Sequence, residues 1–190
     1  MKDIKDSKSK LISNQDMLNF DHDYHQYKKS RIVSFYHNLM LKRCCNLIMK
    51  NNISRVLDYG CGKARLKTFL PNNVSYEGFD LVKELCTIHD PFVKEYDCIF
   101  ALQVMMLLEK SEILDLVTKF HLHSNWLVVM IPSRNFFKDH ILDRLLGLKN
   151  NRDNWVNSSP HEIYTLISKK FTYQNKKNFF GLNEITLWKK

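Results

Sequence analysis

The sequence contains no long apolar run. The longest apolar stretch suited to a buried strand, residues 126–131, falls far below the roughly 18 residues that are needed to cross a bilayer. The first ten residues are polar and charged, and they lack the apolar core of a secretory signal. These absences predict a protein without a transmembrane segment, and we expect it to be cytoplasmic.

The sequence also lacks cysteines in a pattern that binds metal. Its five cysteines are an odd number, several lie in apolar stretches, and no two have the spacing of a metal site. This usage is typical of reduced, buried thiols in the cytoplasm. We therefore predict no metal ion. The cysteines are Cys44, Cys45, Cys61, Cys86 and Cys98.

Acidic residues are fewer than basic ones. Asp and Glu number 20 and Lys and Arg number 29, which gives a formal net charge of +9 and an isoelectric point near 9.3. An anionic partner such as RNA is therefore possible. However, the lysines are scattered along a sequence that is rich in Lys, Asn and Ile throughout, and a genome low in G and C would produce the same bias. The meaning of the charge stays open.

The composition fits one domain. The chain has 190 residues, of which 44% are hydrophobic and 26% are charged, and these values are ordinary for a soluble globular protein with one sizeable core. Residues 1–29 are interpreted as a polar N-terminal segment and residues 30–190 as a single domain. Apolar residues recur at three- and four-residue steps from about residue 30 to residue 50, which predicts an amphipathic helix.

The stretch at the centre of the domain is 56–66, Val-Leu-Asp-Tyr-Gly-Cys-Gly-Lys-Ala-Arg-Leu. It predicts the end of a buried strand, a turn in which Gly60 and Gly62 let the backbone approach a ligand, and a helix that starts at Ala64. Asp58 stands two residues before the first glycine. A carboxylate at that point would repel a pyrophosphate, so the turn suits a ligand that carries positive charge.

A second acid supports this interpretation. Residues 74–80 are predicted to form a strand that ends in Asp80, which lies 22 residues after Asp58. Nucleotide-binding sheets place an acid about 20 residues after the glycine turn, where it accepts hydrogen bonds from ribose hydroxyls. The alternative is that Asp80 caps a following helix. The spacing from Asp58 favours the first interpretation.

With these two acids, the sequence resembles the class I S-adenosylmethionine-dependent methyltransferases. The run 56–66 is similar to the first motif of that family, with Ala64 in place of the third glycine. The resemblance implies an enzyme, a transferase, whose cofactor is S-adenosyl-L-methionine. It assigns the adenosine ribose to Asp80 and the methionine carboxylate to Arg31, for which a solvated helix charge is the alternative. The cofactor-binding residues that it implies are Arg31, Asp58, Tyr59, Gly60, Cys61, Gly62, Asp80, Leu81, Ala101 and Gln103.

The resemblance also implies the fold. We expect an α/β fold with a doubly wound, mostly parallel sheet of the class I methyltransferase type and an antiparallel C-terminal strand. Only residues 81–95 separate Asp80 from the next clear strand, and two parallel crossovers of roughly ten to twelve residues each cannot fit there, so the third strand is shortened or missing. Further predicted elements are a strand over 96–102, a helix from Ser111 to about His123, a strand over 126–131, a helix capped by Ser159 with Glu162, and strands over 171–177 and 184–188.

The sequence after residues 96–102 restricts the substrate. It contains no Asn-Pro-Pro-Tyr or Asp-Pro-Pro-Tyr, which family members that methylate exocyclic base amines or glutamine amides use to hold a planar nitrogen. These substrates are therefore disfavoured. A hydroxyl acceptor would benefit from a base. His25, His140 and His161 lie where the family builds its acceptor pocket, but each is better explained as a surface histidine, and we assign no catalytic residue.

Three functions remain open. The preferred one is methyl transfer to a small molecule or glycan acceptor, at oxygen. The second is methylation of RNA, which the charge favours but for which the sequence has no recognisable RNA-binding motif. The third is a cofactor-binding partner subunit without activity of its own, which the shortened or missing third strand suggests.

Overall fold

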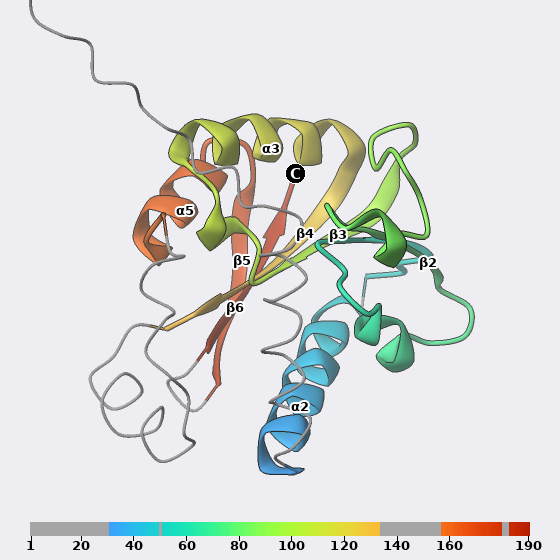
Figure 1. Cartoon of the computed structure of the whole chain (residues 1–190). Helices are drawn as coiled ribbons and strands as arrows, with labels where there is room; N and C mark the ends of the chain where they lie inside the picture. The colour runs from blue at the N-terminus through green and yellow to red at the C-terminus, as the bar shows by residue number, and fades with distance from the viewer. Residues whose placement is uncertain (1–30, 50, 134–156, 180–182) are drawn as a thin grey trace, which may run out of the picture. The chain divides into compact units, whose positions relative to one another are not determined.

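The computed structural model describes residues 31–49, 51–133, 157–179 and 183–190 (Figure 1). The chain divides into two compact units, Met1–His37 and Asn38–Lys190, and the first turns of helix α2 belong to the first unit. This helix spans Arg31–Ile48 and agrees with the amphipathic helix expected over residues 30–50. The domain boundary expected at residue 30 stays a prediction. In the described ranges, no helix is both long enough and apolar enough to span a membrane.

A six-stranded sheet forms the centre of the Asn38–Lys190 unit (Figure 1). The strands are β1 (Arg55–Tyr59), β2 (Ser75–Phe79), β3 (Tyr96–Leu102), β4 (Ser124–Pro132), β5 (Thr172–Phe179) and β6 (Asn183–Lys189). Their order is β2-β1-β3-β4-β6-β5. The first four strands are mutually parallel, and β6 runs antiparallel to both β4 and β5. The expected α/β fold with a mostly parallel sheet and an antiparallel C-terminal strand is confirmed.

The connections that flank β2 are short. Between β1 and β2 lies only the 3₁₀-helix η1 (Arg65–Phe69), and between β2 and β3 only η2 (Lys83–Leu85). Residues 80–95 are all described and contain no strand, which confirms the expected loss of the third strand. The helix expected to start at Ala64 begins one residue later, at Arg65, and is a 3₁₀-helix. Ala64 is its N-cap and has a left-handed backbone, with φ 54° and ψ 33°.

The loop after β2 folds back onto that strand. The backbone N–H of Thr87 donates to the carbonyl of Gly78 at 2.8 Å, and the N–H of Gly78 donates to the Thr87 hydroxyl at 2.7 Å. The N–H of Ile88 also donates to the Gly78 carbonyl, at 3.3 Å. The loop therefore satisfies polar groups of β2 that a further strand would otherwise pair with.

Two helices, α3 (Lys110–His123) and α5 (Pro160–Ile167), cover one face of the sheet (Figure 1). The helix expected from Ser111 begins one residue earlier, because Glu109 is its N-cap and forms a capping box with Glu112. The expected cap of α5 is confirmed. Buried residues of this face include Leu57, Ile99, Leu127 and Val129 on the strands and Ile113, Val117, Phe120 and Ile163 on the helices.

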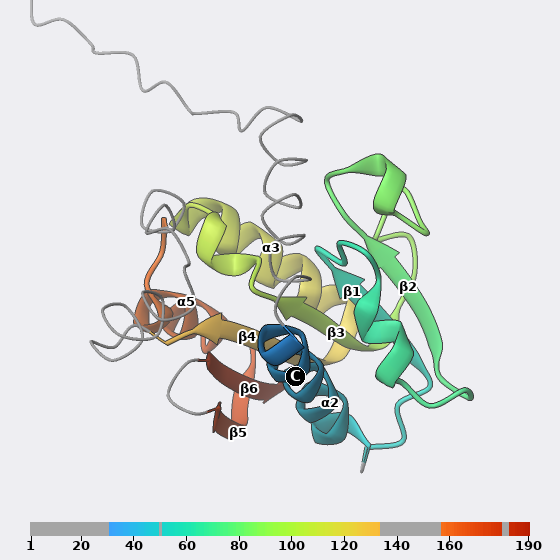
Figure 2. The same ribbon diagram turned by 60° about the horizontal axis from the view of Figure 1, so that its bottom comes forward.

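The other face of the sheet packs against the Asn38–Ile48 part of α2. Figure 2 shows this part of the helix on the side of the sheet away from α3. Burial raises the pKa of Cys98 on β3 well above its ordinary range, and the nearby thiols of Cys45 and Cys44 raise it further. These cysteines are therefore protonated core residues. Buried residues of this layer include Met40, Cys44, Cys45 and Ile48 on the helix and Val56, Cys98, Phe100 and Val128 on the strands.

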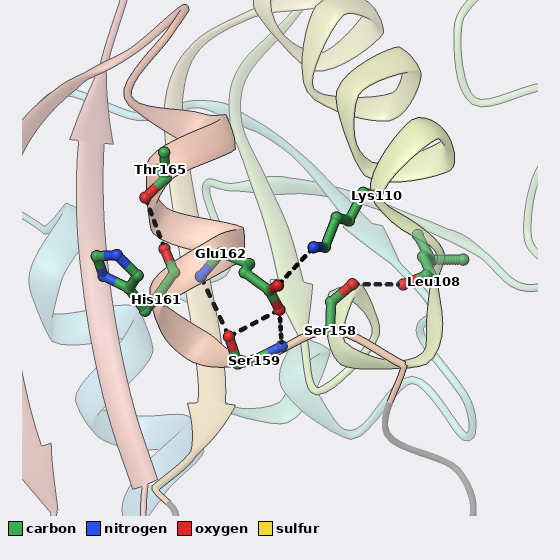
Figure 3. A network of polar contacts seen from close by, with 7 residues as sticks. All are labelled: Leu108, Lys110, Ser158, Ser159, His161, Glu162 and Thr165. Atoms are coloured by element: carbon green, nitrogen blue, oxygen red, sulfur yellow. Dashed lines mark hydrogen bonds and ion pairs between the residues drawn. The ribbon is translucent and has the colours of Figure 1, made fainter.

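A polar network joins the start of α5 to α3 and to the loop after β3 (Figure 3). The Nζ of Lys110 lies 2.6 Å from Oε1 of Glu162, and the N–H and hydroxyl of Ser159 donate to Oε2 at 2.9 and 2.8 Å. These hydrogen bonds lower the pKa of Glu162 to about 2. The hydroxyl of Ser158 donates to the carbonyl of Leu108 at 2.9 Å. The network holds the chain that enters α5 against the turn η3 (Met105–Leu107), which follows β3.

Candidate functional site

Two acidic side chains lie at the carboxyl edge of the sheet, on the neighbouring strands β1 and β2. Asp58 is in register with Gly78, and Asp80 follows Gly78 by two residues. Because residues two apart along a strand point to the same face, the two aspartates belong to one face of the sheet. The charge of Asp80 contributes to the raised pKa of Asp58, which agrees with this proximity. The two acids that the sequence analysis singled out therefore come together.

Asp80 is held by the glycine turn and by the loop that follows β2. Its Oδ2 accepts a hydrogen bond of 2.9 Å from the N–H of Gly62, and its Oδ1 accepts one of 3.0 Å from the N–H of Val82. The thiol of Cys86 donates to the Asp80 carbonyl at 2.9 Å and accepts from the Asp80 N–H at 3.1 Å. Backbone and side chain of Asp80 are thus fixed, while each carboxylate oxygen retains further acceptor capacity.

Asp58 is almost completely buried, with 3% of its surface exposed. Its Oδ2 accepts a hydrogen bond of 2.9 Å from the hydroxyl of Tyr76. Burial raises the pKa of Asp58 to about 7; the Tyr76 hydrogen bond opposes this rise, and the charge of Asp80 adds to it. A carboxyl group with a pKa near neutrality can lose its proton when a cation binds nearby, so Asp58 can respond to a positive ligand.

The two glycines of the turn are required for different reasons. Both have positive φ, +76° at Gly60 and +48° at Gly62. A Cβ at Gly60 would lie 2.2 Å from Cγ2 of Val104, a residue of the loop after β3, so this position has no room for a side chain. A Cβ at Gly62 would meet nothing within 4 Å. Gly60 therefore permits packing between two loops, and Gly62 borders open space beside Asp80.

Gln103 also has an unusual backbone, with φ +63° directly after β3. Its Nε2 donates to Oδ1 of Asn183 at 3.3 Å. Asn183 is 6% exposed and lies at the start of β6, in register with Pro132 at the end of β4. A left-handed non-glycine residue costs about 1–2 kcal/mol, and such strain is concentrated at functional sites. The strained Gln103 lies at the same sheet edge as the two acids, next to the Val104 that packs on Gly60.

Three other predicted residues have different surroundings. The ring of Tyr59 lies on the α3 face, with ring centroids 5.1 Å from Phe79 and 5.2 Å from Phe120, so its side chain is opposite to that of Asp58. Ala101 is fully buried near the end of β3, whereas Leu81 is 63% exposed directly after Asp80. The assignment of these residues to cofactor binding stays a prediction.

Cys61 and Arg31 complete the predicted set. The thiol of Cys61 is buried between the turn and the loop after β2, and it lies 3.6 Å from the carbonyl oxygens of Gly62 and Leu85. Burial, with the charge of Asp58, raises its pKa to about 12. Arg31 is the first residue of α2, and its side chain lies outside the described part of the chain. Its role stays a prediction.

Sequence reasoning missed three residues at this edge: Tyr76, Val104 and Asn183. The alternation of β2 could have indicated Tyr76, because it shares a face with Gly78 and Asp80. Val104 and Asn183 reach the site from distant segments, and nothing in their local sequence marks them. They contribute the surface that covers Gly60 and the amide partner of Gln103, respectively.

Of the three histidines considered as bases, His161 alone lies in the described part of the chain. His25 and His140 lie outside the described residues. His161 is exposed on α5, and Figure 3 shows its ring pointing away from the Lys110–Glu162 contact. The described residues contain no group of three or more His, Cys, Asp or Glu side chains that could hold a metal ion. No catalytic residue is assigned.

Comparison with known proteins gives matches among solved structures alone. No protein-family model matches the chain, and neither does any curated protein sequence. The structure of magnesium protoporphyrin IX methyltransferase from Synechocystis PCC 6803 with bound SAH matches with a TM-score of 0.66 and 14% identity, over 91% of this chain and 94% of that chain.

Two further structures extend the comparison. Human N-acetylserotonin methyltransferase in complex with SAM has a TM-score of 0.57 and 14% identity, over 78% of this chain and 51% of that one. Small RNA methyltransferase HEN1 has a TM-score of 0.57 and 17% identity, over 80% and 25% of the two chains. At these identities the likeness concerns the fold. The chain has the fold of the class I S-adenosylmethionine-dependent methyltransferases, as its first motif predicted.

Proposed function

We propose that the chain is an S-adenosyl-L-methionine-dependent methyltransferase that acts on a small molecule or glycan, at oxygen. The observation that carries this proposal is the pair of aspartates at one sheet edge. Asp80 binds the glycine turn at Gly62, and the buried Asp58 lies on the same face with a pKa near 7. Solved structures of the same fold that hold SAM or SAH support the choice of cofactor.

The two acids fit the two polar parts of this cofactor. Ribose hydroxyls need an acceptor, and the oxygens of Asp80 can each accept more than the one backbone hydrogen bond that they already receive. The ammonium and sulfonium groups are positive, and Asp58 can supply a negative charge by losing its proton. The open space at Gly62 leaves room for a ligand against the backbone.

When bound, the cofactor supplies a methyl group on a sulfonium, which is already a good leaving group. The chain then contributes mainly by holding the two reactants in line. Asp80 would orient the nucleoside, and Asp58 would balance the positive charge. Gln103, fixed through Asn183, would present an amide near the acceptor at the carboxyl edge of β3.

Two observations support a small acceptor and oxygen. The names of two matched structures describe methyltransferases of magnesium protoporphyrin IX and of N-acetylserotonin, which are small molecules. The chain lacks the Asn-Pro-Pro-Tyr type of sequence after residues 96–102 that would hold a planar nitrogen. Together they favour an oxygen atom of a small molecule or glycan.

Calorimetric titration of SAM and SAH into the full chain tests cofactor binding. We expect Asp80→Asn to weaken binding by about tenfold or more, because a charge-assisted hydrogen bond contributes roughly 1.5–3 kcal/mol. Asp115→Asn is the matched control: this exposed residue of α3 pairs with Lys119 at 2.8 Å, and its replacement should leave binding unchanged. Equal affinity of all three proteins would contradict the proposed role of Asp80, and absence of binding to the wild type would overturn the function.

RNA is the second candidate acceptor, favoured by the formal charge of +9 and by the match to small RNA methyltransferase HEN1. An experiment with cofactor labelled in its methyl group distinguishes the two. The labelled cofactor is incubated with the protein and with either an RNA fraction or a small-molecule fraction. Label in RNA alone would replace the proposed acceptor. Cofactor binding without transfer to either fraction would indicate a non-catalytic partner subunit, an alternative that the short connections around β2 favour.

A further inference from the structure

Four lysines gather at the amino end of β4, on the opposite edge of the sheet from the two acids. Lys169 and Lys170 lie in the turn between α5 and β5, and Lys189 and Lys190 lie at the end of β6. The register brings the two pairs together, because Thr172 is paired with Lys189. All four side chains are exposed. We call this surface the lysine edge.

The positive charge of the lysine edge is not neutralised within the described part of the chain. Four other lysines there, Lys94, Lys110, Lys119 and Lys176, each pair with a carboxylate at 2.5–2.8 Å. None of the described carboxylates forms such a pair with a lysine of the lysine edge. Lys42, Lys67, Lys83 and Lys177 likewise form no such pair in the described part of the chain, so the lysine edge is distinguished by the closeness of its lysines, which the strand register brings together.

A neighbouring histidine responds to this charge. The pKa of His121, near the end of α3, is lowered by its burial and then by the charges of Lys190 and Lys170. The effect on His121 places Lys170 and Lys190 close to it on the α3 side of the sheet, whereas Lys189 is paired with Trp126 on the opposite face, so the lysine edge covers both faces at this end of the sheet.

Aromatic groups lie among these cations. The Nζ of Lys189 is 5.3 Å from the ring centroid of Trp126 at the start of β4. Tyr173, three residues after Lys170, is 50% exposed, and the ring of His121 lies 5.4 Å from that of Phe171, which is itself buried. Lysines that hold phosphates next to aromatic rings that stack on bases are the chemistry of single-stranded nucleic acid binding.

We propose that the lysine edge binds the phosphodiester backbone of a single-stranded nucleic acid. An anionic membrane is less well matched, because Leu122 is the one large aliphatic side chain exposed in the described residues 120–126, 168–173 and 187–190, which form this surface. The surface is separated from the carboxyl edge by β4, whose nine residues correspond to about 30 Å. The proposal therefore concerns a docking surface and does not depend on methyl transfer.

Fluorescence anisotropy with labelled oligo-U and oligo-dT of about 20 nucleotides tests the proposal. The test variant is Lys169→Ala/Lys170→Ala/Lys190→Ala. The matched control is Lys42→Ala/Lys67→Ala/Lys83→Ala, which removes the same charge from exposed positions elsewhere. Each titration is repeated from about 50 to 300 mM salt, because each phosphate contact contributes about 0.7 to the slope of log K against log salt.

We expect the test variant to lose about tenfold or more in affinity and about 2 in salt slope, and the control to stay close to the wild type. The same loss for oligo-U and oligo-dT would identify the backbone as the recognised group; a loss confined to oligo-U would identify RNA. Equal losses in both variants, or no binding of either oligonucleotide by the wild type at low salt, would overturn the proposal. So would binding to phosphatidylserine vesicles with no binding to the oligonucleotides.

Discussion

Two aspartates at opposite edges of the same sheet have pKa values that are shifted in opposite directions. Asp97, at the amino end of β3, accepts hydrogen bonds from the N–H and hydroxyl of Ser54 at 2.8 and 2.7 Å and from the N–H of Arg55 at 2.8 Å. Burial alone would raise the pKa of Asp97, but these hydrogen bonds outweigh it and lower the pKa. Asp58, at the carboxyl edge, has one such bond and a raised pKa.

The backbone shows the same difference between the edges. Five described residues have positive φ: Gly60, Gly62, Ala64 and Gln103 follow the carboxyl ends of β1 and β3, and Asn52 lies in the turn between α2 and β1. At the amino edge, Asp97 instead ties the start of β3 to the start of β1. The carboxyl edge therefore holds most of the left-handed backbone and a poorly solvated acid, as expected where a ligand binds, whereas Asp97 stabilises the amino edge.

Gly60→Ala should have the largest effect on stability. The new Cβ meets Val104 at 2.2 Å and forces a side chain into a left-handed backbone, so we expect a loss of about 2–4 kcal/mol in urea unfolding. Gly62→Ala, with no such neighbour, should lose only about 1–2 kcal/mol, which is the cost of placing a side chain on a left-handed backbone. Gly60→Ala/Val104→Ala should regain part of the loss, and no recovery would show that the contact with Val104 is unimportant.

Asp58→Asn should stabilise the protein in a pH-dependent way. The folded state raises the pKa of Asp58 from 3.8 to about 7, so its favourable contribution is complete below pH 3.8 and is lost as the pH rises to about 7. Asparagine does not ionise and can still accept from Tyr76. We expect a gain of about 2 kcal/mol in the free energy of unfolding at pH 8 and none near pH 4. Each pKa unit is worth about 1.4 kcal/mol, and the substitution removes only part of the cost of burying the carboxylate.

Calorimetry completes this test. At pH 8 the same variant should bind SAH more weakly than the wild type, because the negative charge is absent. A variant that loses stability at pH 8, or binds SAH as well as the wild type does, would contradict the contrast between the two edges.

Asp97→Asn should change the free energy of unfolding in the opposite direction and by a smaller amount. The pKa of Asp97 is lowered in the folded state, so its contribution is present above the unfolded value near 4 and is lost as the pH falls further. We expect a loss of about 1–2 kcal/mol at pH 7 from three weakened, solvent-exposed hydrogen bonds, and a smaller difference at pH 3. SAH affinity should be unchanged; a fall in affinity would mean that the two edges are coupled.

Ala64→Gly should give the smallest change, a gain of about 1 kcal/mol, because glycine removes the cost of a left-handed alanine. Thermal unfolding of the two proteins at pH 7 measures it. Ala64→Val is the counterpart and should lose stability, because a β-branched side chain is least compatible with this backbone. Equal stability of all three would mean that the turn relaxes without cost.

The positions of the strands could be predicted from the sequence better than the backbone conformation at the candidate site. Apolar strand ends at β1 and β3 follow from local residue patterns, and the brevity of residues 81–95 correctly indicated that the third strand is shortened or missing. The conformations of Ala64 and Gln103 could not be predicted, because both residues disfavour positive φ and tertiary contacts impose it. The glycine motif identified the turn but not the reason for Gly60, which depends on Val104 from a distant loop.

The fold-back of Thr87 onto Gly78 has a consequence for self-association. Both backbone polar groups of Gly78, near the end of β2, are already hydrogen-bonded, so a strand added along β2 could not pair with this residue. The other outer strand of the sheet is β5, where Lys176 is paired with Glu184 and Lys177 is exposed. The hydrogen bonds between Thr87 and Gly78 thus interrupt the pairing that a second copy would need along β2.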